Sequence, residues 1–149
     1  MPFHHFLKAQ DCQYQNALSE IKDGQKKTHW MWFIFPQVLG LGNSEVSKRY
    51  GISSLQEASL YLEHPELGTR LITITTAVFA LENNSVNSFF GTLDAKKLQS
   101  SMTLFSETSP NNTIFTQVLN KHYGGQRCKR SLELLAWHLN KLKNTPKEV

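Results

Sequence analysis

Residues 28 to 37 read THWMWFIFPQ, and this stretch decides how the rest of the chain must be arranged. The six residues from Trp30 to Phe35 are its longest uninterrupted apolar run. A segment that is apolar on every side must be buried all round or must line a cavity. Pro36 stops a helix from continuing, and Gly40 and Gly42 permit a tight turn of the backbone. We therefore expect the stretch to supply both core residues and the wall of a pocket.

The rest of the chain shows helical periodicity. Apolar residues recur at spacings of three and four in successive windows, which cover 14–21, 55–62, 67–81, 98–105, 115–122 and 132–142. No stretch alternates with a period of two for long enough to build a sheet. The sequence predicts an all-α fold, a compact single-domain multi-helical bundle of six to eight helices. The domain should span residues 1–149, with an ordered core from about residue 6 to 143.

Residues that favour helix ends punctuate these windows. A left-handed glycine can close the first helix, a Ser-x-x-Glu capping box can open the helix at 55, and proline suits a first turn. Further N-caps are expected at Ser44, which opens a short helix through Tyr50, and ahead of the windows at 98 and 115. The residues in these roles are Gly24, Ser44, Ser54 with Glu57, Pro65, Asp94, Asn112 and the pair Gly124-Gly125.

These helices should share one core. We expect ten side chains to form it continuously: Trp30, Phe33, Leu71, Ile74, Val78, Leu98, Met102, Phe105, Leu135 and Leu139.

Composition excludes several classes of protein. The chain of 149 residues is 40% hydrophobic and 19% charged, which is typical of a folded globular protein. No apolar run approaches the ~20 residues of a membrane span, and the N-terminus lacks the pattern of a secretory signal. Cys12 and Cys128 stand far apart and offer no zinc spacing. We expect a cytoplasmic protein with no membrane association, no bound metal and no cofactor.

Charge is concentrated at the C-terminal end. From Lys121 onward, seven Lys and Arg residues face two Glu residues and give a net charge of +5, whereas the whole chain carries +4. Such a tail occurs in nucleic-acid binders, but it is also an ordinary solvated helix face. We favour the solvated face and do not expect nucleic acid as a partner.

Three stretches are not explained by periodicity, and together they carry a family resemblance. The three stretches are GQKKTHWMWFIFPQVLGLGNSEVSKRYGI, YLEHPELGTRL and FFGTLDAKKLQSSMTLF. They resemble a bacterial and fungal family catalogued as domain of unknown function 1810. Some members of that family carry a mistaken calpastatin label. The resemblance runs from about Phe6 to Leu142 and implies an all-helical single domain without an assigned activity. The matching positions are Lys26, His29, Trp30, Trp32, Phe33, Pro36, Gln37, Gly40, Gly42, Ser44, Ser47, Tyr50, His64, Pro65, Gly68, Arg70, Asp94, Lys97, Ser101, Met102 and Phe105.

The polar residues of these stretches are the candidate site. Lys26, Arg70 and Lys97 suggest a common anionic ligand, with Trp32, Gln37 and Ser44 as further ligand-binding residues. If chemistry occurs, the candidates are His29, whose ordinary pKa of ~6.5 suits proton transfer, then Asp94, and Ser101 as a nucleophile that needs a base.

Each candidate also has a purely structural interpretation. His29 and the tryptophans can be core residues, Gln37 can tie down a turn, and Ser44 and Asp94 can be helix caps.

Three hypotheses follow, and the motifs leave open whether the protein is an enzyme. We favour a pocket that binds, and can hydrolyse or transfer, a small phosphate-bearing, nucleotide-like metabolite. The alternative is a non-enzymatic protein-interaction module whose partner the sequence does not name. The third is nucleic-acid binding through the basic C-terminal part, with Trp137 and His138 beside the cations.

Overall fold

The computed structural model describes residues 3–82, 86–108 and 113–144, with side chains described as far as residue 141. Within these ranges there is no strand, and an isolated parallel bridge joins Val38 to Ile52. The described residues form eight helices: α1 His4–Asp23, α2 Met31–Ile34, α3 Glu45–Arg49, α4 Leu55–Glu63, α5 Pro65–Phe79, α6 Val86–Thr108, α7 Ile114–Tyr123 and α8 Lys129–Asn144. The all-α prediction is confirmed, at the upper end of the expected six to eight helices.

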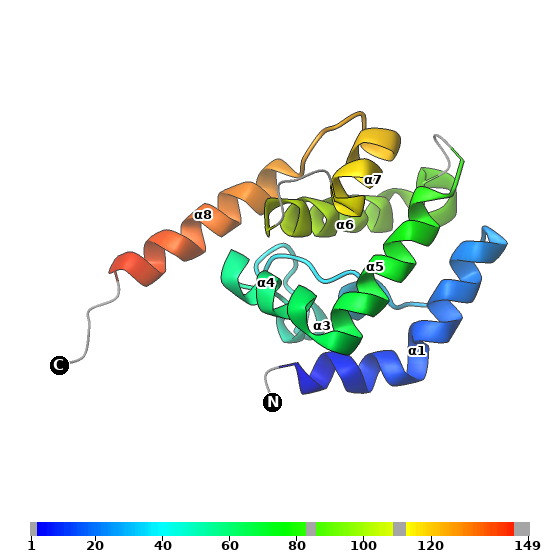
Figure 1. Cartoon of the computed structure of the whole chain (residues 1–149). Coiled ribbons are helices and arrows are strands. Elements are labelled where there is room, and N and C mark those ends of the chain that lie inside the picture. The colour runs from blue at the N-terminus through cyan, green and yellow to red at the C-terminus, as the bar shows by residue number, and fades with distance from the viewer. Residues whose placement is uncertain (1–2, 83–85, 109–112, 145–149) are drawn as a thin grey trace.

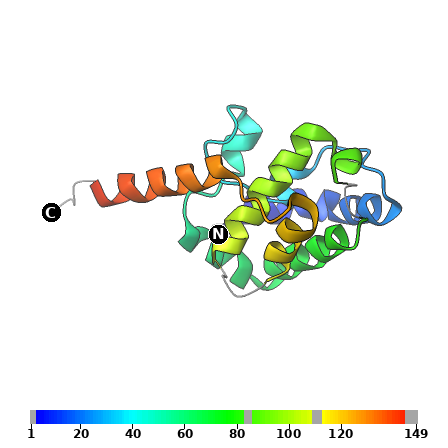
Figure 2. The same cartoon turned by 90° about the horizontal axis from the view of Figure 1, so that it is seen from above.

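Seven of the helices form a body from which α8 extends. Helix α5 packs against α1, α4 and α7, and α6 packs against α4 and α7, so that α5 and α6 lie at the centre of the contacts. Figures 1 and 2 show from two directions that the C-terminal half of α8 runs away from the body. Three features hold α8 to the body as far as His138: the Ser100 and Ser131 hydroxyls 2.6 Å apart, buried Leu134, and His138 itself, whose Nε2 lies 2.8 Å from the Leu39 carbonyl oxygen.

The core is one cluster to which all the helices except α3 contribute buried apolar side chains. Seven of the ten predicted core residues are buried in it, and Phe33 and Leu135 are partly buried against it. The prediction is wrong for Leu139, whose side chain is 53% exposed. Leu139 lines an open groove between α8 and the start of α4, which leaves about half of its side chain in contact with solvent.

Most of the predicted helix ends are confirmed. Gly24 adopts a left-handed φ of 76° after α1, and Gly124 does the same after α7 with φ 61°. Ser54 caps α4 by accepting the Glu57 N–H at 3.0 Å. The Glu57 carboxylate reaches back to the N–H of Ser53 at 3.1 Å, one residue earlier than in a standard capping box. Local sequence therefore determined where these helices begin and end.

Two predicted N-caps turned out differently. Asp94 does not open a helix, because α6 begins at Val86 and is interrupted at Gly91, where φ is 79° and ψ is 161°. The helix has already resumed when it reaches Asp94, which leaves that carboxylate free to pair with other groups. Asn112 lies outside the described residues, and Thr113 caps α7 by accepting the Thr116 N–H.

Candidate functional site

A buried carboxylate on α1 holds the segment that leads into the aromatic stretch. Oε1 of Glu20 accepts the N–H groups of Lys27 and Thr28 and the indole N–H of Trp30, at 2.7, 3.1 and 3.1 Å. Its Oε2 accepts the Thr28 hydroxyl at 2.7 Å. Burial by itself would raise the pKa of Glu20, but the hydrogen bonds from Thr28, Lys27 and Trp30 outweigh it and lower that pKa to about 2. Glu20 is therefore an ionised anchor that fixes how the chain enters α2.

The aromatic stretch divides its side chains between the core and the surface. Trp30 and Phe35 are fully buried, and both pack against Phe90 of α6. Trp32 and Phe33 are half-buried on the other side of α2. Because Pro36 follows Phe35, the C-cap of this four-residue helix, the helix cannot continue, and the two rings lie beside open space.

That open space is a cavity of about 370 Å³, within the usual range for small-molecule sites. Its wall comes from the segment before α2, from α2, from the start of α3 and from α6. The lining residues are Lys26, His29, Trp30, Met31, Trp32, Phe33, Ser44, Val46, Asp94 and Lys97. We call this cavity the tryptophan–lysine pocket.

Two lysines and one aspartate form the charged part of the tryptophan–lysine pocket. Oδ2 of Asp94 lies 3.1 Å from Nζ of Lys26, and Oδ1 lies 3.2 Å from Nζ of Lys97. Each ammonium also lies over a tryptophan ring, Lys26 at 4.8 Å from the Trp30 centroid and Lys97 at 4.9 Å from that of Trp32. With two cations and one anion, these three side chains carry a net charge of +1.

The two lysines differ in how far their hydrogen-bonding capacity is used. An ammonium has three N–H donors. Lys26, with a side chain only 8% exposed, directs one to the Thr28 carbonyl at 2.6 Å, one to Asp94 and one towards Trp30. Lys97 is 31% exposed and has two partners among the described residues, Asp94 and the Trp32 ring. Lys26 is thus saturated by the protein, whereas Lys97 keeps one donor for a molecule in the pocket.

A glycine sets the position of the Trp32 ring. A Cβ atom on Gly42 would lie 3.0 Å from the edge of that ring and 2.9 Å from the Ser47 side chain. Ser47 is in turn fixed to Ser44, since its N–H donates to the Ser44 hydroxyl at 3.1 Å and its own hydroxyl donates to the Ser44 carbonyl at 2.7 Å. Ser44 therefore caps α3 and also lines the pocket.

Three predicted site residues do not line this pocket. Gln37 is buried, and its amide donates to the Phe35 carbonyl at 3.4 Å, which ties down the turn. Ser101 is fully buried in α6, and its hydroxyl has no hydrogen-bond partner among the described residues. The expectation that they surround one cavity with Lys97 is wrong because helical spacing places residues on a face without saying what covers that face.

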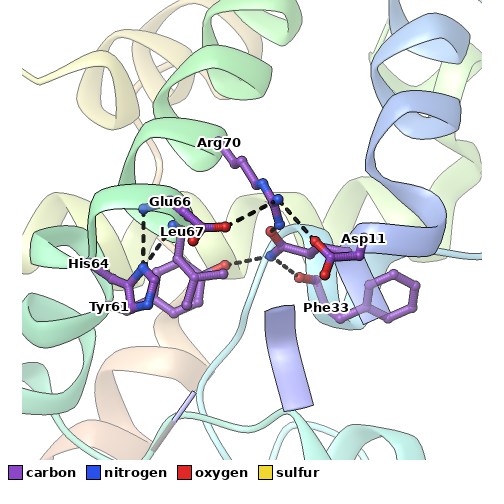
Figure 3. Close-up of polar contacts among 8 residues, drawn as sticks. Asp11, Phe33, Tyr61, His64, Glu66, Leu67 and Arg70 are labelled. Carbon is purple, nitrogen blue, oxygen red and sulfur yellow. Dashed lines mark hydrogen bonds and ion pairs between the residues drawn. The ribbon is translucent and has the colours of Figure 1, made fainter. Parts of the chain in front are cut away.

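Arg70 is the third residue, and it belongs to a network between α1 and α5 (Figure 3). Its guanidinium lies 3.0 Å from a carboxylate oxygen of Asp11 and 3.5 Å from one of Glu66. It also donates to Gln10 at 3.5 Å, whose amide N–H₂ donates to the Phe33 carbonyl and the Tyr61 hydroxyl. With two carboxylates as partners, Arg70 stabilises the packing of α1 against α5 and lies outside the tryptophan–lysine pocket.

The predicted catalytic residues do not form a linked set. His29 is exposed and lines the pocket. In the described part of the chain, no hydrogen bond joins it to Asp94 or to Ser101. Ser101 has no base beside it and no access to the cavity, which removes the nucleophile role. The arrangement supports binding more directly than it supports a reaction.

Sequence reasoning missed Glu20, because its partners lie seven to ten residues further on, across a turn that no local motif announces. It also missed Val46 and Met31 in the pocket lining. An acidic residue one turn before a left-handed glycine is the only signal that could have drawn attention to Glu20.

The described residues contain no cluster of three or more His, Cys, Asp or Glu side chains placed to hold a metal ion. None of their helices combines the length and the apolar character needed to cross a membrane.

Comparison with known proteins gives a family without an assigned activity. The model of a family described as a protein of unknown function, DUF1810, matches residues 1–135. The crystal structure of a conserved hypothetical protein from Mycobacterium tuberculosis is similar, with a TM-score of 0.87 and 45% sequence identity over 91% of this chain and 99% of that chain. Among curated proteins no relative matches. The family predicted from the three aperiodic stretches is confirmed.

Proposed function

The chain belongs to the DUF1810 family of proteins of unknown function, and we propose that its tryptophan–lysine pocket binds a small phosphate-bearing metabolite. The observation that carries the proposal is Lys97: an ammonium with an unused donor, held over Trp32 at the wall of a cavity of about 370 Å³. A cation that is partly withdrawn from water and already oriented binds an anionic group with a charge-assisted hydrogen bond.

The electrostatics of the pocket support an anion over a cation. Lys26 and Lys97 together outweigh Asp94 by one charge. His29 lies at the same pocket and adds no negative charge to it. A positively charged ligand would meet a net repulsion, whereas a phosphate gains from Lys97 at short range and from Lys26 at longer range.

The rings of the pocket limit how a nucleotide-like ligand would lie. Trp30 is fully buried and holds Lys26 over its face, so it offers no surface for stacking. Trp32 is half-buried, and it is the ring that a planar or apolar part of the ligand would meet. Binding thus relies mainly on Lys97, with Trp32 and Ser44 as secondary contacts.

The pocket lining offers fewer groups for a reaction than for binding. His29 is the side chain in the lining that is suited to proton transfer, and Asp94 is engaged by both lysines. Hydrolysis or transfer of the bound phosphate would therefore depend on His29, without the Ser101 nucleophile.

Calorimetric titration of AMP and adenosine tests the binding proposal. AMP should bind and adenosine should bind much more weakly, because the phosphate is the group that Lys97 recognises. Lys97→Met should weaken AMP binding by about 1.5–3 kcal/mol, the range of a hydrogen bond to a charged group, and should leave the thermal transition in place. The partly exposed position of Lys97 makes the methionine tolerable.

Lys141→Met is the matched control. Lys141 also lies over a tryptophan, with Nζ 5.0 Å from the Trp137 centroid, but it is exposed on α8 and does not line the pocket. Its replacement should leave AMP binding within twofold of the wild type. Equal binding by wild type and Lys97→Met, or an equal loss in Lys141→Met, would contradict the proposal.

A further inference from the structure

Asp94 is an acceptor whose capacity is only half used. Its two carboxylate oxygens each contact one ammonium, Oδ2 that of Lys26 and Oδ1 that of Lys97. An ionised carboxylate offers about four acceptor sites, and no backbone or hydroxyl donor among the described residues takes the remaining ones. Its side chain is 19% exposed and lines the tryptophan–lysine pocket, so the unused sites are open to a bound molecule.

The contact with Lys26 holds the Asp94 carboxylate in a fixed orientation. Lys26 is saturated by Thr28, Trp30 and Asp94, and its near-complete burial keeps it there. Asp94 therefore cannot turn away when a ligand enters, and its acceptor sites are already oriented. A ligand group that donates a hydrogen bond to Asp94 finds the carboxylate already oriented, which lowers the conformational entropy lost on binding.

The charge of the cluster selects the kind of donor. Two ammonium groups already compensate Asp94, so a third cation would be repelled by Lys97 more than it is attracted. A second anionic group would be repelled by Asp94 itself. A neutral hydrogen-bond donor such as a hydroxyl is repelled neither by Lys97 nor by Asp94.

We propose that the ligand is a hydroxylated phosphate of the polyol- or sugar-phosphate class, whose phosphate binds Lys97 while a hydroxyl donates to Asp94. This inference rests on the proposed function and narrows it. Because Nζ of Lys97 and Oδ1 of Asp94 are 3.2 Å apart, the two ligand groups lie within about 9 Å of each other when both contacts have ordinary hydrogen-bond lengths. A hydroxyl on the carbon skeleton that carries the phosphate satisfies this limit.

The experiment compares glycerol 3-phosphate with n-propyl phosphate, which has the same carbon chain and no hydroxyl. Titrated calorimetrically into the wild-type protein, glycerol 3-phosphate should bind at least about tenfold more tightly, the lower end of the effect of a hydrogen bond to a charged group. Both compounds carry the same phosphate, so the difference isolates the hydroxyl contact.

The Asp94→Asn variant tests whether Asp94 is the residue that causes the difference in affinity between glycerol 3-phosphate and propyl phosphate. The preference for glycerol 3-phosphate should fall to less than about threefold, since a neutral amide oxygen accepts more weakly than a carboxylate. Propyl phosphate should bind the variant more tightly than the wild type, because the charge of the cluster rises from +1 to +2. A thermal melt reports whether the variant is folded, and the wild-type comparison stands without it.

The outcomes separate this inference from the proposed function. Equal binding of the two compounds to the wild type, with Lys97-dependent AMP binding intact, overturns the hydroxylated class and leaves the phosphate pocket standing. A preference that survives in folded Asp94→Asn shows that the hydroxyl is recognised elsewhere and also overturns the inference. If AMP, propyl phosphate and glycerol 3-phosphate all fail to bind, the proposed function falls as well.

Discussion

Replacing Glu20 with Gln should destabilise the protein by about 3 kcal/mol at pH 7. The magnitude follows from the carboxylate's four hydrogen-bond donors, which lower its pKa from the usual 4.5 to about 2. Each unit of pKa shift corresponds to about 1.4 kcal/mol of preference for the ionised form in the folded state. The side chain is only 8% exposed, so solvent screening reduces this value little.

The pH dependence of the loss has a definite sign. Because the folded-state pKa of Glu20 lies below its unfolded-state value, the ionised carboxylate stabilises the fold fully above about pH 4.5. That contribution decreases as the pH falls through the range from about 4.5 to about 2, and it is lost below about 2, where the group is protonated in the folded state as well. The difference in unfolding free energy between wild type and Glu20→Gln should therefore be largest near neutral pH and should shrink steadily below pH 4.5.

The assay is urea unfolding followed by tryptophan fluorescence at a series of pH values from 7 to 3. Trp30 is a direct probe, since its indole N–H donates to the carboxylate that is being removed. The difference between the unfolding free energies of the two proteins at each pH cancels the contribution of every other carboxylate that titrates. Glu63→Gln, at the exposed end of α4, is the matched control and should change the unfolding free energy by less than about 0.5 kcal/mol at any of these values.

Two results would refute the reasoning. A loss below about 1 kcal/mol at pH 7 would mean that the four donors do not act on an ionised Glu20. A large loss that does not change between pH 7 and 3 would mean that shape rather than charge is responsible. Either result would also remove Glu20 as the anchor of the segment that leads into the pocket.

Two further predictions concern packing. Gly68→Ala should destabilise the protein by about 3 kcal/mol or more in thermal or urea unfolding, because the new Cβ would overlap the carbonyl oxygen of Leu62 where α5 meets α4. A change under about 1 kcal/mol would show that the two helices can move apart at little cost. Leu139→Ser should change the unfolding free energy by less than about 0.5 kcal/mol because Leu139 is exposed, whereas Phe105→Ala in the core should lower it by about 3–5 kcal/mol. A larger loss in Leu139→Ser than in Phe105→Ala would show that α8 packs differently.

Much of the fold could be predicted because helix formation and termination are local. Gly24, Ser54 and Pro65 act on backbone groups within four residues of themselves, and the structure confirms all three. Gly91 shows the limit of this reasoning. It interrupts α6 ahead of Asp94, so the aspartate that looked like a cap lies inside the helix.

The candidate site could be predicted only in part. Lys26, His29, Trp32, Ser44, Asp94 and Lys97 come together at one pocket, but their common place depends on how α6 packs beside α2. Arg70 stands in an equally aperiodic stretch, yet it pairs with Asp11, which is 59 residues away in the chain. Nothing in the local sequence distinguishes these two outcomes.

The sequence by itself thus determined the helices, most of their ends and the family. It also indicated that the stretch 28–37 serves both core and pocket, although it placed Gln37 in the pocket wall and Phe33 in the core, where the structure has Gln37 buried and Phe33 half-buried at the pocket. Periodicity and capping depend on interactions over a few residues, and the sequence displays those directly. Only the tertiary structure decided that Leu139 is exposed, that Ser101 is covered, and that Lys97 keeps a free donor while Lys26 does not. These outcomes depend on contacts between segments far apart in the chain, where the packing of whole helices determines which polar groups meet.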